Sequence, residues 1–323
     1  MGVRDFETKD PVLDDTLFHA ASLSKPLFAY GALTFVQAGV LDLDKPLHTY
    51  LPLPEADEIS QLKTTTARHI LSHTSGLQNW RIKTTDKFKF AFAPGLDFPY
   101  SGEGFYYLQC VVEQISGQSI EMFLQEHVLR PLGMHRSTFA WRNGYESEIS
   151  MGHRDRGNKV VPWIMQYAPE IEEIITQTEK PFTHWLFYES RDALPQIDPE
   201  ATPMPYNFYP NVAFSLLTTA PEFAQFVLCL LNPDDAVARL MLTAQHTLTH
   251  ELAWGLGIGL ERVNNDLCFW HWDNMGIFTS FVFGNTVTCQ DTVIFTNDLR
   301  GLQVCERILQ EFNGRHLDAF MWL

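Results

Sequence analysis

The sequence predicts a mixed α/β (α+β) fold, in which a helix-rich middle is followed by an antiparallel sheet and a closing helix. Three observations support this fold class. A long apolar segment that ends in a glycine begins near residue 23. Further apolar segments with helix start and stop signals follow as far as residue 231. After residue 254 the pattern changes to short segments of alternating or continuous apolar residues, which is typical of strands.

The first predicted helix carries a candidate nucleophile. The segment Thr16–Leu41 reads TLFHAASLSKPLFAYGALTFVQAGVL, and Pro26 places the helix start near Leu23 because a proline ring clashes with a carbonyl deep inside a helix. Ser22 and Lys25 are three residues apart, so the amine can reach the hydroxyl on one helix face. A serine becomes a nucleophile when a base takes its proton, and an amine can be that base if its pKa is lowered. Free N–H groups at the helix start would also favour negative charge at Ser22.

The S-x-x-K pattern alone has low specificity. A chain of this length is expected to contain it about once by chance, and this sequence contains it twice. The second copy, Ser60 and Lys63, runs into three threonines with no apolar helix behind it, so we expect Ser60 in a loop. On the local pattern alone, Ser22 as a helix cap with Lys25 as a surface lysine fits equally well.

Caps and glycines predict the other helices of the middle region. Gly39 ends the first helix, and residues 42–66 form a long connection. The predicted helices are Ala67–Leu71, Phe105–Ile115 with Gly117 after it, Ser119–Leu129, and one that starts at Thr219 or Ala220 and ends at Leu231. For residues 140–210 the sequence predicts loops with one or two helices.

The C-terminal part predicts a sheet. The expected strands lie in segments 255–263, 267–272, 278–285 and 291–298. A helix, Leu302–Phe312, is expected to follow them.

Composition excludes several classes of function. The net charge of −16 argues against nucleic acid or an anionic membrane as a partner, and no segment is long and apolar enough to cross a bilayer. The five cysteines lack C-x-x-C spacing and are odd in number, which indicates reduced thiols. The charged N-terminus has no apolar signal-peptide region, so we expect a soluble, cytoplasmic protein.

Two further residues are candidates for proton transfer. Tyr100 lies in a glycine-flanked turn before a predicted buried helix, where it could relay a proton or be an ordinary half-buried aromatic. His271 and Asp273 are two residues apart on a predicted strand, so they share one face, while Trp270 and Trp272 share the other. Taken in isolation, this pattern favours an ordinary strand histidine with the tryptophans in the core.

We expect neither a metal ion nor a cofactor. The histidine pairs at positions 69 and 73, and at 246 and 250, lack the glutamate of the H-E-x-x-H motif and have no cysteine cluster beside them. The sequence also lacks the glycine motifs that bind nucleotides.

Several segments in a fixed order are more specific than any single motif. These segments are AASLSKPLFAYGAL, ARHILSHTSGL, FPYSGEGFYYLQCVVEQISGQSIEMFLQEHVLRPLGM, SLLTTAPEFAQFV and FWHWDNMG. Together they resemble the serine β-lactamase-like superfamily, in its class C β-lactamase, carboxylesterase and D-peptidase branch. The resemblance covers nearly the whole chain and implies one domain, residues 1–323, with a β-lactamase/penicillin-binding-protein-like fold. An α/β lobe (about 1–50 and 235–323) would hold an antiparallel sheet flanked by helices, and an all-helical lobe (about 51–234) would face it across the active site.

The resemblance also implies roles for individual residues. Ser22 would be the acylated nucleophile, Lys25 its activating partner, and Tyr100 the tyrosine of the Tyr-x-Asn element. His271 and Trp272 would take the place of the Lys-Thr-Gly strand motif. The oxyanion hole would combine the N–H of Ser22 with a second N–H from that strand, near Asp273 or Asn274.

The chain departs from the family pattern at three places. The Tyr-x-Asn element reads Tyr100-Ser101-Gly102, so the amide that would bind a β-lactam or a peptide is missing, which favours esters. Asp273 stands where related chains usually have glycine, and it could displace the second oxyanion donor, whose loss costs about 2.7–4 kcal/mol of transition-state stabilisation. About 21 residues precede Ser22, where family members normally have a helix and two strands. We therefore expect either a truncated or mis-started chain, or a sheet that lacks its N-terminal edge hairpin and exposes pairing groups.

We therefore expect a serine hydrolase that acts through an acyl-enzyme on carboxylic esters. A β-lactamase or D-amino-acid peptidase is the alternative, and a non-catalytic binding relative of the fold is a further one. Trp80, Trp270, Trp272 and Phe278 are candidates for an apolar acyl pocket, although each fits the core equally well. The expected partner is a small-molecule ester or amide substrate, and the oligomeric state is left open.

Overall fold

A six-stranded antiparallel sheet from the C-terminal part of the chain is the largest element of the fold. In a computed structural model, the structure describes residues 2–81, 86–142, 144–154, 158–160, 168–189, 192, 210–314 and 316–323. The strand order is β10-β9-β8-β7-β6-β5, so each strand pairs with its neighbour in sequence. The strands are β5 (His246–Thr247), β6 (Leu252–Trp254), β7 (Gly259–Val263), β8 (Asp266–Asn274), β9 (Thr279–Asn285) and β10 (Gln290–Thr296). All four predicted strand segments are confirmed, whereas β5 and β6 were not predicted.

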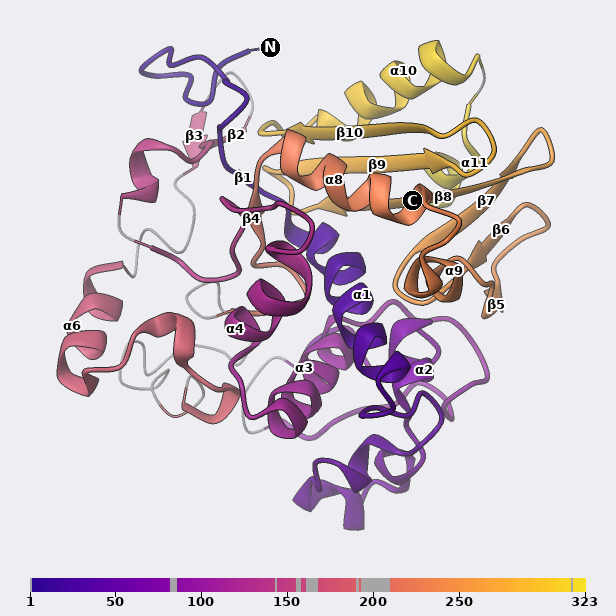
Figure 1. Cartoon of the computed structure of the whole chain (residues 1–323). Helices are drawn as coiled ribbons and strands as arrows, with labels where there is room; N and C mark the ends of the chain where they lie inside the picture. Colours follow the sequence, from indigo (N-terminus) through magenta and orange to yellow (C-terminus); the bar gives the residue numbers. More distant parts are fainter. Residues whose placement is uncertain are drawn as a thin grey trace.

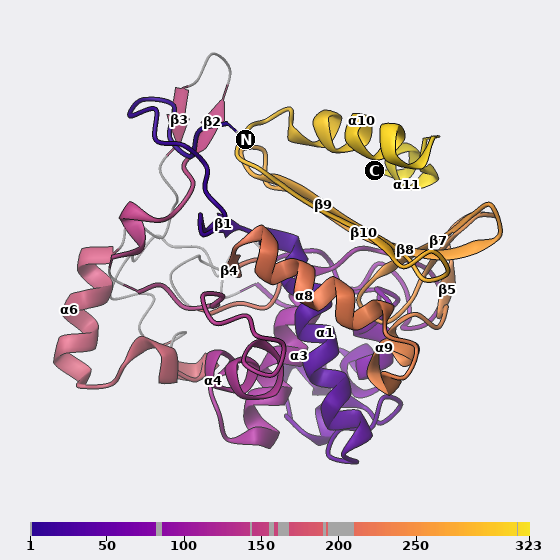
Figure 2. The same ribbon diagram turned by 45° about the horizontal axis from the view of Figure 1, so that its top comes forward.

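Helices cover both faces of this sheet (Figures 1 and 2). On one face α8 (Ala220–Leu231) packs on β9 and β10, and sheet residues such as Phe269 join a core with α1 (Ser24–Gln37). On the other face α10 (Gly301–Asn313) and α11 (Asp318–Trp322) cover a second core that contains Trp270. Both faces of the strands are therefore buried, which explains their nearly continuous apolar sequence.

The helix α1 runs through the middle of the molecule, as Figure 1 shows. It is buried along its first ten residues, from Ser24 to Leu33. Gly31 lies where a side chain would meet Leu124 and Val128 at about 3.0 Å, so the helical segment 120–129 packs directly on its backbone. The helix ends at Gln37, and Gly39 has a φ of +71°, the left-handed conformation predicted for the glycine that ends this helix.

The remaining helices confirm most of the boundaries predicted from caps. The helix α2 (Ala67–Leu71) begins at a capping box of Thr66 with His69, and α3 (Gly102–Ser116) ends at Gly117. The predicted helix 119–129 is α4 (Ile120–Leu124) continued by a π-helical turn (Gln125–Leu129). The helix α8 begins after Thr219, as predicted. Other elements are α6 (Ala168–Thr178), α9 (Ala236–Met241), and the short pairs β1 (Phe18–His19) with β4 (Leu217–Thr218) and β2 (Gly152–Arg154) with β3 (Asn158–Val160).

Short 3₁₀ turns connect these elements, and one corrects a prediction. They are η1 (Ala21–Leu23), η2 (Leu47–Thr49), η3 (Pro54–Asp57), η4 (Ser60–Lys63), η6 (Tyr145–Ser147) and η8 (Phe182–His184). Ser60 was expected in a loop but begins η4, which is exposed at its start. The division into two lobes stays a prediction. The helix α8 was assigned to the helical lobe, but it packs on the sheet. Much of segment 140–210 lies outside the described residues.

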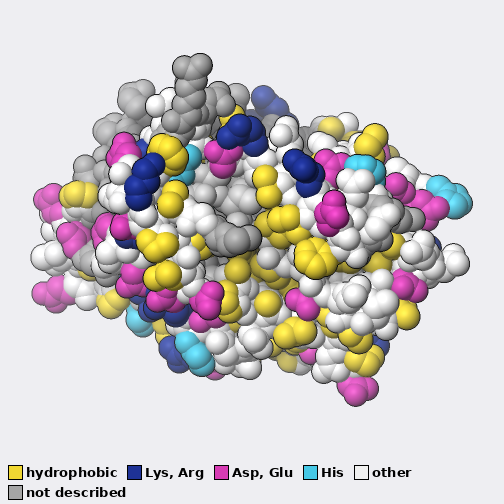
Figure 3. Space-filling model, turned by 90° about the horizontal axis from the view of Figure 1, so that it is seen from above, with side chains coloured by type: hydrophobic (Ala, Val, Ile, Leu, Met, Phe, Trp, Pro, Cys, Tyr) yellow, Lys and Arg dark blue, Asp and Glu magenta, His cyan; other side chains and the backbone are white. Residues whose placement is uncertain are grey.

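The net charge is −16, but acidic side chains do not gather into one patch on the face seen in Figure 3. Acidic, basic and apolar side chains are interspersed there. Among the described residues, no helix is both long and apolar enough to span a membrane.

Candidate active site

Ser22 lies in the middle of the 3₁₀ turn η1, just before α1, half-buried against β8. The preceding residue, Ala21, has a φ of +44°, an unusual conformation for a residue with a side chain. Strained backbone of this kind is often found at functional sites. The Oγ of Ser22 is 3.0 Å from the Nζ of Lys25, so the predicted pair is in hydrogen-bond contact. The two residues belong to consecutive turns of different helix type, yet their three-residue spacing still brings them together.

Lys25 is a buried amine. Its side chain is 2% exposed, and Nζ also donates a 2.7 Å hydrogen bond to the carbonyl of Ala213. Burial lowers the pKa of Lys25 to about 7, although the carboxylate of Asp273 raises it. An amine with this pKa is partly neutral near pH 7 and can accept a proton. Burial therefore excludes the alternative that Lys25 is a surface lysine.

Tyr100 approaches the same pair from the start of α3. The Nζ of Lys25 lies 4.8 Å from the centre of its ring. The hydroxyl group is buried without a hydrogen bond of ordinary geometry among the described residues. Burial raises the pKa of Tyr100, while the nearby hydroxyl of Ser22 lowers it. Tyr100 is thus neutral, close to Ser22, and able to donate a proton.

His73 holds Tyr100 in place, a role that the sequence did not indicate. Its ring stacks on Tyr100 at 4.3 Å between centres, and its Nδ1 accepts the N–H of Ser101 at 3.1 Å. Burial lowers the pKa of His73 well below the usual value. The only sequence signal was its place in the segment S-H-T-S-G, where His73 also has a positive φ of 55°.

The strand β8 contributes His271 and Asp273 from its face toward α1. His271 donates from Nδ1 to the carbonyl of Trp272 at 2.9 Å, and its Nε2 has no partner among the described residues. Burial and the charge of Lys25 lower the pKa of His271 to about 3, so the ring is neutral. Trp270 lies in the core on the opposite face, and Trp272 is partly buried against that core, with 5.7 Å between the two ring centres. The ring of Trp272 also lies 5.5 Å from that of Tyr100. The predicted alternation of this strand is therefore confirmed.

Asp273 contacts the backbone of Ser22 directly. The backbone N–H of Ser22 donates to Oδ1 of Asp273 at 3.0 Å. The next residue, Asn274, is exposed at the end of β8.

The remaining candidates lie at the edges of this cluster. Trp80 packs over Gly102 so closely that a side chain there would come within 2.0 Å of its ring. Phe278 is buried against His19, with 4.9 Å between ring centres. Whether either residue lines an acyl pocket stays a prediction.

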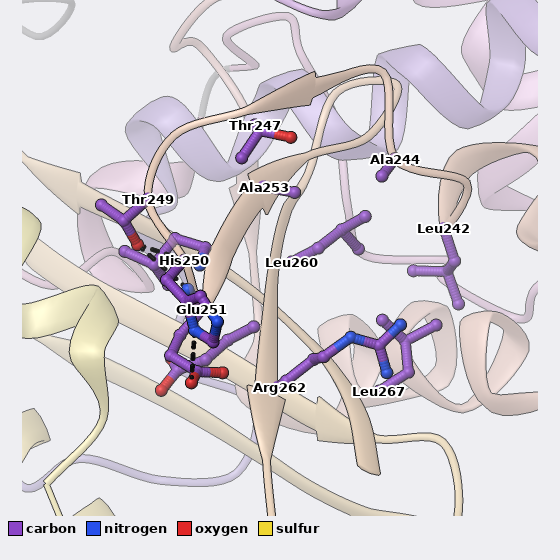
Figure 4. Close-up of a pocket in the computed structure, with 12 residues that line it drawn as sticks. Leu242, Ala244, Thr247, Thr249, His250, Glu251, Ala253, Leu260, Arg262 and Leu267 are labelled. Atoms are coloured by element: carbon purple, nitrogen blue, oxygen red, sulfur yellow. Dashed lines mark hydrogen bonds and ion pairs between the residues drawn. The ribbon is translucent and has the colours of Figure 1, made fainter. Parts of the chain in front are cut away.

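A separate hollow of about 280 Å³ lies on the sheet edge formed by β5 to β7 (Figure 4). Nδ1 of His250 lies 2.9 Å from a carboxylate oxygen of Glu251 in its lining, and Arg262 extends along its wall. Its lining includes Leu267, near the start of β8, whereas His271 and Asp273 lie near the other end of that strand. Within the described ranges, no cluster of three His, Cys, Asp or Glu side chains could hold a metal ion.

A family model described as beta-lactamase matches residues 1–302. The chain belongs to the beta-lactamase family. It is 31% identical over 166 residues to the esterase EstB of Burkholderia gladioli, covering 43% of this chain and 42% of the relative. It is 29% identical over 157 residues to penicillin-binding protein 4* of Bacillus subtilis (strain 168), covering 42% of this chain and 33% of that protein. The chain thus spans well under half the length of these two relatives.

Solved structures share the fold over nearly the whole chain. The octameric penicillin-binding protein homologue from Pyrococcus abyssi has a TM-score of 0.72 at 19% identity, covering 98% of this chain and 70% of that one. A class C beta-lactamase has a TM-score of 0.69 at 17% identity, covering 92% and 81%. The predicted family and fold class are therefore confirmed.

Proposed function

We propose that this beta-lactamase family member is a serine hydrolase that cleaves carboxylic esters through an acyl-enzyme. The observation that carries the proposal is the 3.0 Å contact between Ser22 Oγ and Lys25 Nζ, with the amine buried and its pKa lowered to about 7. A nucleophile with a neutral base in hydrogen-bond contact is the minimal arrangement for covalent catalysis.

The proposed acylation uses the neutral form of Lys25. One hydrogen of the amine remains on the carbonyl of Ala213, and the lone pair accepts the proton of Ser22. Ser22 Oγ then attacks the ester carbonyl carbon, and the N–H groups of Ser22 and of the end of β8 stabilise the oxyanion.

Breakdown of the tetrahedral intermediate completes the cycle. The bond to the leaving oxygen breaks as Lys25 or Tyr100 donates a proton to it, which releases the alcohol. Water, deprotonated by the same pair, then attacks the acyl-enzyme and releases the acid with Ser22 restored. His271 stays neutral throughout because its pKa is about 3. Its proposed part is therefore to fill its place beside Lys25 without adding a second positive charge there.

Two features of the site and the name of one relative support esters over the alternatives. Position 102 is a glycine with the ring of Trp80 against it, so this position offers no side-chain amide to a β-lactam or a peptide. The carboxyl group of Asp273 beside Ser22 disfavours substrates that carry a carboxylate, as cephalosporins and peptides with a free C-terminus do. A curated relative of comparable identity is named an esterase.

The second candidate function is binding without turnover. The contact between Asp273 and the N–H of Ser22 favours it, because this N–H is a proposed oxyanion donor. Against it stands the retention of Ser22, Lys25 and Tyr100 in one cluster, which a binding protein does not need.

Burst kinetics with p-nitrophenyl butyrate test the proposal, and the chain supplies a matched control. Ser22→Ala removes the proposed nucleophile, whereas Ser60→Ala removes the exposed serine of the second S-x-x-K segment. We expect a burst equal to the enzyme concentration in the native protein and in Ser60→Ala, and none in Ser22→Ala. A burst that persists in Ser22→Ala would refute the assignment. Faster turnover of a chromogenic cephalosporin than of the ester would favour the β-lactamase alternative.

A further inference from the structure

The backbone N–H of Ser22 is already bound by a side chain of this protein. It donates a 3.0 Å hydrogen bond to Oδ1 of Asp273, which is 251 positions away in the sequence. In the proposed acylation this N–H must point at the carbonyl oxygen of the substrate, because an N–H at a helix start stabilises the developing negative charge. One oxygen of Asp273 therefore occupies the place that the acyl oxygen needs.

The carboxyl group of Asp273 interacts with more than this one donor. Burial raises its pKa to about 7, although the N–H of Ser22, the charge of Lys25 and the N–H groups of Met275 and Asn274 all lower it. The N–H groups at the end of β8 are the ones from which the second oxyanion donor is expected. The side chain is 2% exposed, so water competes little for these donors.

Stability alone does not account for this carboxyl group. Its second oxygen, Oδ2, has no hydrogen bond of ordinary geometry among the described residues. A buried carboxylate oxygen without a donor costs free energy, and such atoms are uncommon in native proteins. The pairing of β8 with β9 does not need it, since Asp273 lies opposite Ser280 in an ordinary backbone ladder.

We propose that Asp273 limits the acylation of Ser22, because its carboxyl group plugs the oxyanion hole of the free protein. This inference rests on the proposed function. A substrate must displace the carboxyl group from the N–H of Ser22 before its carbonyl carbon can be attacked. The negative charge acts in the same direction, because it favours the protonated form of Lys25, which cannot take a proton.

Two substitutions separate occupancy from charge. Asp273→Gly empties the space next to the N–H of Ser22 and restores the donor to the substrate. Asp273→Asn keeps an oxygen of the same shape on that N–H but removes the negative charge. The matched control is Asp266→Asn on the same strand, about 23 Å from Asp273 along β8. Asp266 accepts a hydrogen bond from the side chain of Asn285. Its substitution by asparagine therefore makes the same chemical change away from the site.

The measurement is the second-order rate at which a fluorophosphonate labels Ser22, with the labelled peptide located by mass spectrometry between pH 5 and pH 8. We expect Asp273→Gly to label about 10²-fold faster than the native protein, since one oxyanion donor is worth a factor of about 10²–10³. Asp273→Asn should label less than tenfold faster, with the rising limb of the pH profile moved to lower pH. Asp266→Asn should label at the native rate.

The outcomes distinguish this inference from the function on which it rests. Labelling of Ser22 at equal rates in the native protein and in Asp273→Gly would overturn the plug and leave Ser22 as the nucleophile. No label on Ser22 in either protein would overturn both proposals. If Asp273→Gly unfolds, Asp273→Ala empties the same space with less backbone freedom, and it must show the same acceleration for the plug to stand.

Discussion

Replacing Lys25 by methionine tests the role of the buried amine more directly than any other single change. Methionine is unbranched and of similar length, so it fills the same space while losing the base. Lys63→Met is the control, because Lys63 belongs to the second S-x-x-K segment but is 48% exposed and pairs with Asp57 on the surface. General-base catalysis contributes a factor of about 10²–10⁴, so the burst rate of Lys25→Met should fall by at least 10²-fold while Lys63→Met keeps the native rate.

The pH dependence follows from the pKa of Lys25. Only the neutral amine accepts a proton, and with a pKa of about 7 its neutral fraction falls about tenfold per pH unit below pH 7. Acylation of the native protein should therefore be about 100-fold slower at pH 5 than above pH 8. Stopped-flow bursts recorded at the isosbestic wavelength of nitrophenol measure this rate across the range. Circular dichroism at each pH checks that the protein stays folded.

The same substitution should stabilise the protein at neutral pH. The pKa of Lys25 in the folded protein lies below the unfolded value of 10.5. The contribution of Lys25 to the free energy of unfolding is therefore fully present above pH 10.5 and is lost as the pH falls through 7, so that at pH 7 the buried amine costs stability. This shift corresponds to a cost on the order of 5 kcal/mol, from which about 2 kcal/mol of lost hydrogen bonds must be subtracted. Lys25→Met should thus melt at a higher temperature than the native protein at pH 7. A native burst rate in Lys25→Met, or a flat rate between pH 5 and pH 8, would refute the reasoning.

Three further predictions follow from single contacts. Tyr100→Phe should slow the burst at least tenfold while the melting temperature holds or rises, because the buried hydroxyl makes no hydrogen bond of ordinary geometry within the described part of the chain; an unchanged burst would exclude a proton relay. Gly102→Ala should destabilise the protein by about 1–3 kcal/mol in urea unfolding, since the new methyl group would lie 2.0 Å from the ring of Trp80; unchanged stability would mean that the ring moves freely. Glu261→Gln should cost about 1–3 kcal/mol, because the buried carboxylate accepts the N–H of Asp318 at 2.8 Å at the start of α11; hydrogen exchange should show α11 loosening first, and uniform exchange would contradict this.

Local signals in the sequence determined most element boundaries. Thr66 and Thr219 accept backbone N–H groups at the starts of α2 and α8, and Gly39 and Gly117 take the left-handed conformation after α1 and α3. These residues act through their own backbone and nearest neighbours, so their effect can be predicted without the rest of the chain. The strands β8, β9 and β10 were also predictable from local sequence, because each has seven to nine consecutive residues that carry its apolar pattern. The two-residue and three-residue strands β5 and β6 are too short to carry one.

The sequence favoured the first of the two S-x-x-K segments, but only the tertiary structure shows how differently their lysines are buried. Lys25 and Lys63 have the same spacing from a serine, yet the first is buried under α3 and β8 while the second lies in solvent. Burial sets the pKa of an amine, and burial depends on the whole fold. The same holds for the contact of Ser22 with Asp273 across 251 positions and for the stacking of His73 on Tyr100. The sequence by itself determined the family, the main helices and strands, and the residue types of the site, because these depend on local pattern. The tertiary structure decided which of those residues meet and in which protonation state, because contacts between distant segments set both.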